Sequence, residues 1–195
     1  MPKLEGFGEI RKGNEGKNKE QLEIENHARL ILKDLGLRIE DLRGKKVLDL
    51  GAGKAELAQW AKKQGMNIIN LDNFTGYKRD VPENLSYIEG EADKLPFPDE
   101  SLDLILSHGS PPGITQDREE VVRIVKGAER ALRKDGEFRF GPGYLHPAIF
   151  EEGELFTPDE ENTFSTEERM QRIREKSLEF LKSINPKYNG RSNRR

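Results

Sequence analysis

The stretch that decides the fold is KKVLDLGAGKAE, residues 45–56. Within it, residues 47–50 form a short, largely apolar run of the kind found in parallel strands that are covered on both faces. Gly51 and Gly53 follow at once, and glycines there let the chain turn sharply and bring backbone N–H groups close to a ligand. A helix that begins after the turn would present its positive end to the same ligand. The stretch therefore predicts a nucleotide or nucleoside site at a strand–turn–helix junction.

The residues after the two glycines separate this motif from other nucleotide motifs. A dinucleotide fingerprint has a small residue at the position of Glu56, where it lets the helix pack closely on the strand. A triphosphate loop needs Gly-Lys-Ser/Thr, whereas Lys54 is followed by Ala55. What fits is Asp-x-Gly-x-Gly-x-Ala over residues 49–55. A purely structural glycine turn is the alternative interpretation.

This pattern resembles motif I of the class I S-adenosylmethionine-dependent methyltransferases, usually Asp/Glu-x-Gly-x-Gly-x-Gly, with Ala55 in place of the third glycine. The segment GEADKLPFPDESLDLILS, residues 90–107, looks very like the "GDAxxLPFPDxSFDLV" segment of the small-molecule members. ERALRKDGEFRF, residues 129–140, resembles their "RVLKPGG" segment. The resemblance covers about residues 40–145. It implies S-adenosyl-L-methionine as the cofactor and S-adenosyl-L-homocysteine as the product.

Strand and helix patterns alternate along the chain, which predicts an α/β fold. We expect a Rossmann-like, mostly parallel sheet with helices on both faces. Strands are expected over 47–50, 66–71, 84–89, 103–107 and 137–141, and helices over 19–35, 54–64, 117–132 and 165–184. Few residues follow the last helix, so the C-terminal β-hairpin that the family has is expected to be missing or reduced.

Length and composition indicate one compact domain. The chain has 195 residues, of which 33% are hydrophobic and 35% are charged. We expect a mobile N-terminal arm over 1–18, a single methyltransferase-like domain over 19–184 and a polar, basic tail over 185–195. The absence of cysteine excludes disulfides and thiolate metal sites. With no long apolar run and a charged amino terminus, we expect a cytoplasmic protein.

Asp72 is the first candidate outside the glycine turn. It ends the strand that follows the turn, about twenty residues on, where a carboxylate can accept hydrogen bonds from both ribose hydroxyls. A loop or helix-capping Asp is the alternative. The resemblance assigns the adenine amino group to Asp93, the adenine ring edge to the backbone at Ala92, and the methionine ammonium group to the carbonyl of Ser107. The expected cofactor-binding residues are Asp49, Gly51, Ala52, Gly53, Asp72, Asn73, Ala92, Asp93 and Ser107.

His108 is the candidate for a catalytic residue. Methyl transfer needs a general base only if the acceptor is a poor nucleophile at neutral pH. His108 follows Ser107 at the end of the fourth predicted strand, so we expect its side chain to face the transferred methyl; His146 and Tyr144 are weaker candidates. A loop histidine without catalytic role is the alternative. No His, Asp and Glu cluster has ligand spacing, so we expect no metal.

The predicted function is S-adenosylmethionine-dependent methyl transfer to an unidentified small-molecule acceptor. The alternative is a non-catalytic adenosylmethionine-binding protein that acts as a sensor or partner subunit, since an open sheet edge invites a second copy or another protein. A nicotinamide oxidoreductase is disfavoured by Glu56. The net charge of −3 disfavours nucleic acid as a partner, and no membrane partner is expected.

Overall fold

A computed structural model describes residues 19–73, 81–141, 143–151, 153–156 and 164–185. The predicted N-terminal arm lies outside these residues, as does the predicted tail apart from Asn185. Among the described residues, no helix combines the length and apolar character needed to cross a membrane.

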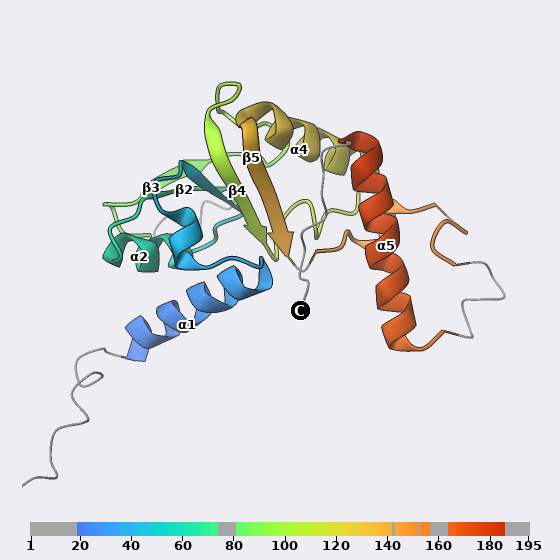
Figure 1. Cartoon of the computed structure of the whole chain (residues 1–195), viewed down its shortest axis with the longest axis horizontal. Helices are drawn as coiled ribbons and strands as arrows, with labels where there is room; N and C mark the ends of the chain where they lie inside the picture. The colour runs from blue at the N-terminus through green and yellow to red at the C-terminus, as the bar shows by residue number, and fades with distance from the viewer. Residues whose placement is uncertain (1–18, 74–80, 142, 152, 157–163, 186–195) are drawn as a thin grey trace, which may run out of the picture.

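A parallel sheet of five strands forms the centre of the described part of the chain (Figure 1). The strands are β1 (Val47–Leu50), β2 (Ile68–Asp72), β3 (Ser86–Glu89), β4 (Leu102–His108) and β5 (Leu132–Gly141). Their order is β3-β2-β1-β4-β5, and each neighbouring pair is parallel. The order reverses between β1 and β4, and open α/β sheets bind ligands at the carboxyl ends of the strands at such a reversal. The predicted Rossmann-like α/β fold is confirmed.

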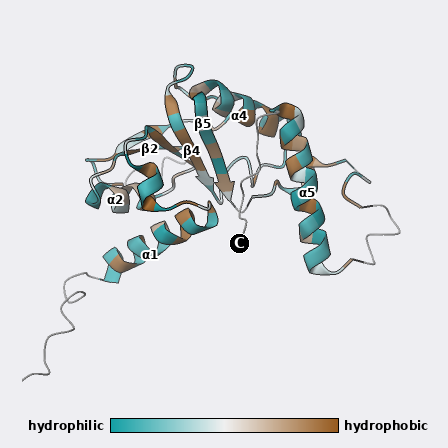
Figure 2. Ribbon diagram, viewed as in Figure 1, coloured by the Kyte–Doolittle hydropathy of each residue, from teal (hydrophilic) through white to brown (hydrophobic). Residues whose placement is uncertain are grey.

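Helices cover both faces of this sheet. They are α1 (Lys19–Asp34), α2 (Glu56–Lys63), α4 (Arg118–Ala131) and α5 (Thr166–Ile184), with short 3-10 turns η1 (Ile39–Leu42) and η2 (Pro147–Ile149). Val47 packs with α1 and α2 on one face, whereas Leu48 and Leu50 pack with α4 on the other. This alternation follows from the two-residue period of a strand. Figure 2 shows that α1 and α5 are mostly hydrophilic, as expected for helices that bury one side only.

Strand β5 begins earlier than the sequence predicts. The apolar stripe predicts a helix to residue 132 and a strand over 137–141, but Leu132 has the extended angles φ −77° and ψ 139° and pairs with Leu102. The pairing register then shifts between Leu102 and Leu104. The helical pattern ends one residue too late because Leu132 gains a cross-strand partner that local sequence cannot reveal.

Helix α5 occupies the side of the domain beyond β5. In the described part of the chain no strand follows β5, and α5 packs against α4 and β5 instead. Ser165 and Glu168 form a capping box at its first turn, as their spacing predicts. The buried cluster between these elements consists of Val121, Val125, Phe140, Leu145, Ile149 and Leu181. The Ser177 hydroxyl accepts a hydrogen bond from the Leu145 N–H at 3.0 Å, which ties α5 to the chain after β5.

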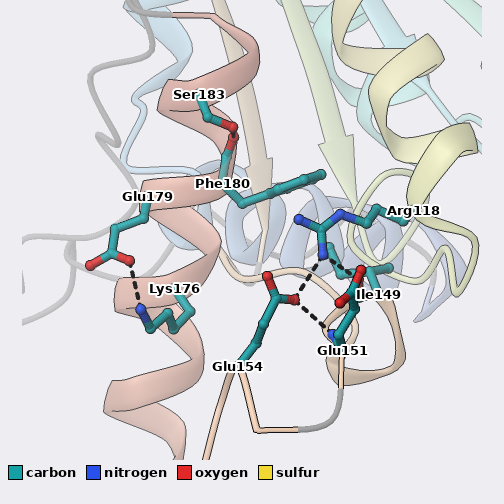
Figure 3. Close-up of polar contacts among 8 residues, drawn as sticks. All are labelled: Arg118, Ile149, Glu151, Glu154, Lys176, Glu179, Phe180 and Ser183. Carbon is teal, nitrogen blue, oxygen red and sulfur yellow. Dashed lines mark hydrogen bonds and ion pairs between the residues drawn. The ribbon is translucent and has the colours of Figure 1, made fainter.

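Arg118, the first residue of α4, connects this C-terminal segment to the sheet domain (Figure 3). Its guanidinium donates to the Glu154 carboxylate at 2.7 Å and to the Ile149 carbonyl at 3.4 Å. It also lies over the Phe180 ring of α5, 4.6 Å from the ring centre. One cation therefore holds both the loop around η2 and the last helix against α4.

Arg118→Ala should lower the free energy of unfolding by about 1–2 kcal/mol, because it removes a cation–π contact and a charge-assisted hydrogen bond together. Chemical denaturation measures the change. Lys19→Ala is the control, since the Lys19–Glu23 pair is far more exposed and joins neighbouring turns of α1; it should change stability by less than about 0.5 kcal/mol. Equal stability of Arg118→Ala and the parent would mean that the apolar cluster alone holds α5.

Candidate functional site

A cavity of about 390 Å³ lies at the carboxyl ends of the strands. This volume falls within the range of about 300–1,000 Å³ that small-molecule sites occupy. The described residues that line it come from the ends of β1 to β4, the loop after β4 and the first turn of α4. They are Leu50, Gly51, Gly53, Leu71, Asp72, Asn73, Gly90, Glu91, Ala92, Gly109, Ser110, Pro111, Ile114 and Glu120.

Gly51 is fixed by the loop that follows β4. It has φ +74°, and a Cβ built on it would lie 2.3 Å from the Cβ of Ser110, so no larger residue fits. The Ser110 hydroxyl donates to the Leu50 carbonyl at 2.7 Å, and the Gly51 N–H donates to the Leu71 carbonyl, also at 2.7 Å. The turn after β1 is therefore held between its two neighbouring strands.

Gly53 is held from the other side of the turn. Its N–H donates to Asp72 Oδ2 at 2.9 Å, and its carbonyl accepts from the Tyr87 hydroxyl at 3.1 Å. A Cβ on Gly53 would meet no atom within 4 Å, although φ is +53°. Asp72 thus shapes the glycine turn and also lines the cavity.

Ala55 precedes α2 in an unusual conformation. It is fully buried and has φ 56° and ψ 36°, in the left-handed region that glycine prefers. The helix consequently begins at Glu56 rather than at residue 54, where the apolar pattern predicts it. The left-handed backbone costs a non-glycine residue about 1–2 kcal/mol. The third glycine of the motif is therefore replaced at a position whose geometry still favours glycine.

Asp49 is a buried carboxyl group beneath the glycine turn. Its residue is 5% exposed, and no described residue donates a hydrogen bond to the carboxylate. Burial, and then the charge of Asp72, raise the pKa of Asp49 to about 7, although the charge of His27 acts in the opposite direction. An unpaired carboxylate in such a position is unfavourable unless a ligand supplies a donor.

The charged residues in the described lining of the cavity carry the same sign. Asp72, Glu91 and Glu120 line it, and its described lining contains no Lys, Arg or His. The Glu91 carboxylate accepts a hydrogen bond from the Asn73 amide at 3.3 Å. Because the amide is neutral, this contact does not compensate the negative charge of Glu91. The cavity is therefore suited to a cationic ligand and unsuited to a pyrophosphate.

The structure gathers some of the predicted cofactor residues and leaves others aside. Five line the cavity: Gly51, Gly53, Asp72, Asn73 and Ala92. Four do not: Asp49, Ala52, Asp93 and Ser107. The Asp93 carboxylate accepts a hydrogen bond from Arg123 of α4 at 3.0 Å. Ser107 is fully buried, and its hydroxyl donates to the Pro111 carbonyl at 2.6 Å. The assigned roles of all nine remain predictions.

His108 does not line this cavity. Its Nε2 lies 2.9 Å from Asp34 Oδ2 at the end of α1, and the imidazole packs next to Gly141. The contact with Asp34 orients the ring toward α1, and the expectation that this side chain faces the transferred methyl stays a prediction. Its catalytic role stays a prediction. Among the described residues, no group of three His, Cys, Asp or Glu side chains is placed to hold a metal.

Sequence reasoning missed four residues of the cavity that carry polar or exposed apolar side chains. Ser110 and Ile114 come from the loop after β4, Glu91 follows β3, and Glu120 lies in the first turn of α4. Ser110 and Glu91 could have been found from the sequence, because each follows the end of a predicted strand, where ligands bind in such sheets. Ile114 is 55% exposed, which is unusual for a large apolar side chain and marks the loop as part of the site.

Residues 48–140 match a family model described as "Methyltransferase domain". The matched segment runs from β1 to β5 and contains the glycine turn and every lining residue of the cavity. By this match, residues 48–140 have the sequence of a methyltransferase domain, in agreement with the resemblance to the class I S-adenosylmethionine-dependent methyltransferases. The cofactor of such a domain is S-adenosylmethionine, and its product is S-adenosylhomocysteine.

Similar solved structures are distant. A Pyrococcus horikoshii protein is 23% identical with a TM-score of 0.48, and the match covers 64% of this chain and 58% of that one. An S-adenosylmethionine-dependent methyltransferase from Mesorhizobium loti is 24% identical with a TM-score of 0.44, covering 59% and 51%. The chain thus spans between half and three fifths of the length of these two proteins. No curated protein matches it.

Gly51→Ala should destabilise the protein by about 2–4 kcal/mol, because the new methyl group would overlap Ser110 in addition to the strain of a positive φ. Gly65→Ala, at φ +76° in open space after α2, carries the backbone strain alone and should lose about 1–2 kcal/mol. Denaturant unfolding of the two variants makes the comparison. Equal losses would contradict the close contact with Ser110.

Asp49→Asn should make the ligand-free protein more stable at pH 8, on the order of 2–4 kcal/mol, because it removes a buried charge. The sign follows from the raised pKa: between about pH 4 and 7 the folded state holds a proton that the unfolded state has lost, so this group lowers stability as pH rises. Near pH 3.5, below the pKa of the carboxyl group in both states, the two proteins should be about equally stable. Thermal unfolding across this range is the measurement, and a stability loss in Asp49→Asn at pH 8 would refute the unpaired carboxylate.

Proposed function

We propose that this chain transfers a methyl group from S-adenosylmethionine to a small-molecule acceptor. The observation that carries the proposal is the acidic character of the cavity next to a glycine turn. S-adenosylmethionine has a positive sulfonium and a positive ammonium group, which match carboxylates. The pyrophosphate of a nicotinamide dinucleotide would instead enter a cavity whose described charged residues are all acidic, and like charges repel.

The cofactor would lie across the carboxyl ends of the strands. Gly51 and Gly53 allow its tail to approach the backbone, and Asp49 beneath the turn supplies the unpaired carboxylate for the ammonium group. Asp72 lines the cavity at the end of β2, where it can accept from ribose hydroxyls. In each assignment the residue offers the hydrogen-bond acceptor that the corresponding cofactor group requires.

The remaining contacts concern the two ends of the cofactor. Ala92 and Asn73 line the cavity, and Ala92 would meet the adenine ring; Asp93, which follows Ala92 in the chain, is the proposed partner of the adenine amino group. Arg123 already holds one oxygen of Asp93, which would fix the carboxylate for the adenine amino group. The Ser107 carbonyl would accept a hydrogen bond from the ammonium group.

Bound S-adenosylmethionine supplies an activated methyl group on its sulfonium sulfur. The protein must then hold the acceptor in line with that methyl and exclude water. Pro111 and the exposed Ile114 border the cavity after β4 and offer apolar surface for this purpose. An acceptor that must lose a proton would need a base; the proposed group is His108, which contacts Asp34 and lies outside the described lining of the cavity. A cytoplasmic location and a partner at the open sheet edge also remain predictions.

Calorimetric titration of the full chain with S-adenosylmethionine, S-adenosylhomocysteine and oxidised nicotinamide dinucleotide tests the proposal. The first two should bind and the third should not. Release of S-adenosylhomocysteine with a panel of small amines, alcohols and carboxylates then identifies the acceptor. Binding of the dinucleotide in place of the first two would refute the proposal, and binding without turnover on any acceptor would favour a non-catalytic binding protein.

Asp72→Asn should weaken S-adenosylhomocysteine binding about 10- to 100-fold, because a charge-assisted hydrogen bond contributes about 1.5–3 kcal/mol. The asparagine oxygen can still accept from the Gly53 N–H, so the turn should persist. Glu89→Gln is the matched control: Glu89 pairs with Asp72 across β2 and β3 but does not line the cavity. Calorimetry should find its affinity within threefold of the parent, and an equal loss in both variants would exclude a specific ribose contact.

A further inference from the structure

We propose that Asp49 and Asn70 share a proton in the cofactor-free protein, and that the ammonium group of the cofactor drives this proton out when it binds. The inference rests on the proposed function, because it assumes that the cofactor binds above Asp49. It makes cofactor affinity dependent on pH and gives Asn70 a positioning role.

Asn70 has an unsatisfied oxygen in the core. The residue is fully buried, and its Oδ1 is the buried side-chain atom without a hydrogen-bond partner in the described structure. Its Nδ2 donates to the Ser86 carbonyl at 2.8 Å and to the Ile68 carbonyl at 3.2 Å. Carbonyls only accept, so the nitrogen must face them and the amide cannot be flipped. Oδ1 therefore needs a donor from elsewhere.

The sheet places Asp49 where that donor is needed. Asp49 of β1 and Asn70 of β2 are paired in the parallel register, and both side chains lie on the face that α1 and α2 cover. Since Nδ2 reaches Ser86 in β3, Oδ1 on the opposite side of the amide turns toward β1. An ionised Asp49 could only accept, and two acceptors would then face each other without a proton between them. A protonated Asp49 donates to Oδ1 and satisfies both groups.

The charged groups around Asp49 do not replace this proton. Asp72 at the end of β2 adds a negative charge, which favours the protonated form. His27 of α1 acts in the opposite direction on the pKa of Asp49, but its Nδ1 contacts the Glu56 carboxylate of α2. On β4 the residue opposite Asp49 is Leu106, which is uncharged. Burial first, and then the charge of Asp72, raise the pKa of Asp49 to about 7.

The cofactor changes this balance. Its ammonium group stays protonated and donates to the Asp49 carboxylate, whose own proton passes to solvent. One bound cation therefore replaces one bound proton. By linkage, affinity should fall up to tenfold for each pH unit below the pKa of Asp49 and should become constant well above it.

Calorimetry in buffers of different ionisation enthalpy counts the protons released. S-adenosylhomocysteine should release between about half a proton and one proton at pH 6.5 and none at pH 9. Adenosine lacks the ammonium group, so it should bind with no release. Release with adenosine, or equal release at both pH values, would overturn the proposal.

Three variants test whether the released proton comes from Asp49 and whether Asn70 stabilises it there. Asp49→Asn should abolish the release, whereas Asp41→Asn, which removes a carboxylate in η1 remote from the cavity, should keep it. Asn70→Ala removes the acceptor that stabilises neutral Asp49, so the midpoint of the pH dependence should move down by about one unit. An unchanged midpoint would remove Asn70 from the proposal.

A measurement on the cofactor-free protein covers the case in which Asn70→Ala does not fold. Carbon NMR of aspartate-labelled protein, with Asp49→Asn for assignment, should show one carboxyl group that titrates near pH 7. A normal acidic titration of Asp49 would overturn the inference. Failure of any cofactor to bind would contradict the proposed function, whereas binding without proton release would contradict this inference alone.

Discussion

The close approach of Gly51 to Ser110 is the constraint on which the rest of the site depends. With no room for a Cβ at residue 51, the ends of β1 and β4 come together, and the Ser110 hydroxyl closes the gap on the Leu50 carbonyl. The same turn is tied to β2 through Leu71 and Asp72. The cavity exists because these three strand ends are held at fixed separation where the strand order reverses.

Polar residues beneath the turn oppose the stability of the domain. Asp49, Asn70 and Tyr87 lie side by side on β1, β2 and β3, in a layer otherwise filled by apolar residues of the core. The Tyr87 hydroxyl donates to the Gly53 carbonyl in the turn, whereas no described residue donates a hydrogen bond to the Asp49 carboxylate or to Asn70 Oδ1. Sites that bind charged ligands often retain such unfavourable groups, since the ligand satisfies them. These polar groups therefore lower the stability of the ligand-free protein and are available to bind a ligand.

The features that could be predicted from the sequence are those that depend on residues close together in the chain. The β1 strand, the glycine turn and the carboxylate at Asp72 follow from local pattern and spacing, and the structure places them together. Contacts between distant segments were not predictable in this way. Asp34 draws His108 toward α1, and Arg123 occupies Asp93, because helices that pack on the sheet bring these partners together. The left-handed backbone of Ala55 was also hidden, since alanine ordinarily favours a helix.

Strand β5 forms one edge of the described sheet, and its composition affects how copies of the protein meet. Its first half carries Arg133, Lys134 and Asp135, all exposed, and Glu137 and Arg139 follow. A strand from another copy that added to this edge would have to bring charges of both signs out of water. Charges on an edge strand oppose aggregation through strand pairing. A concentrated solution of the domain should therefore resist fibril formation even though, in the described part of the chain, no hairpin covers this edge.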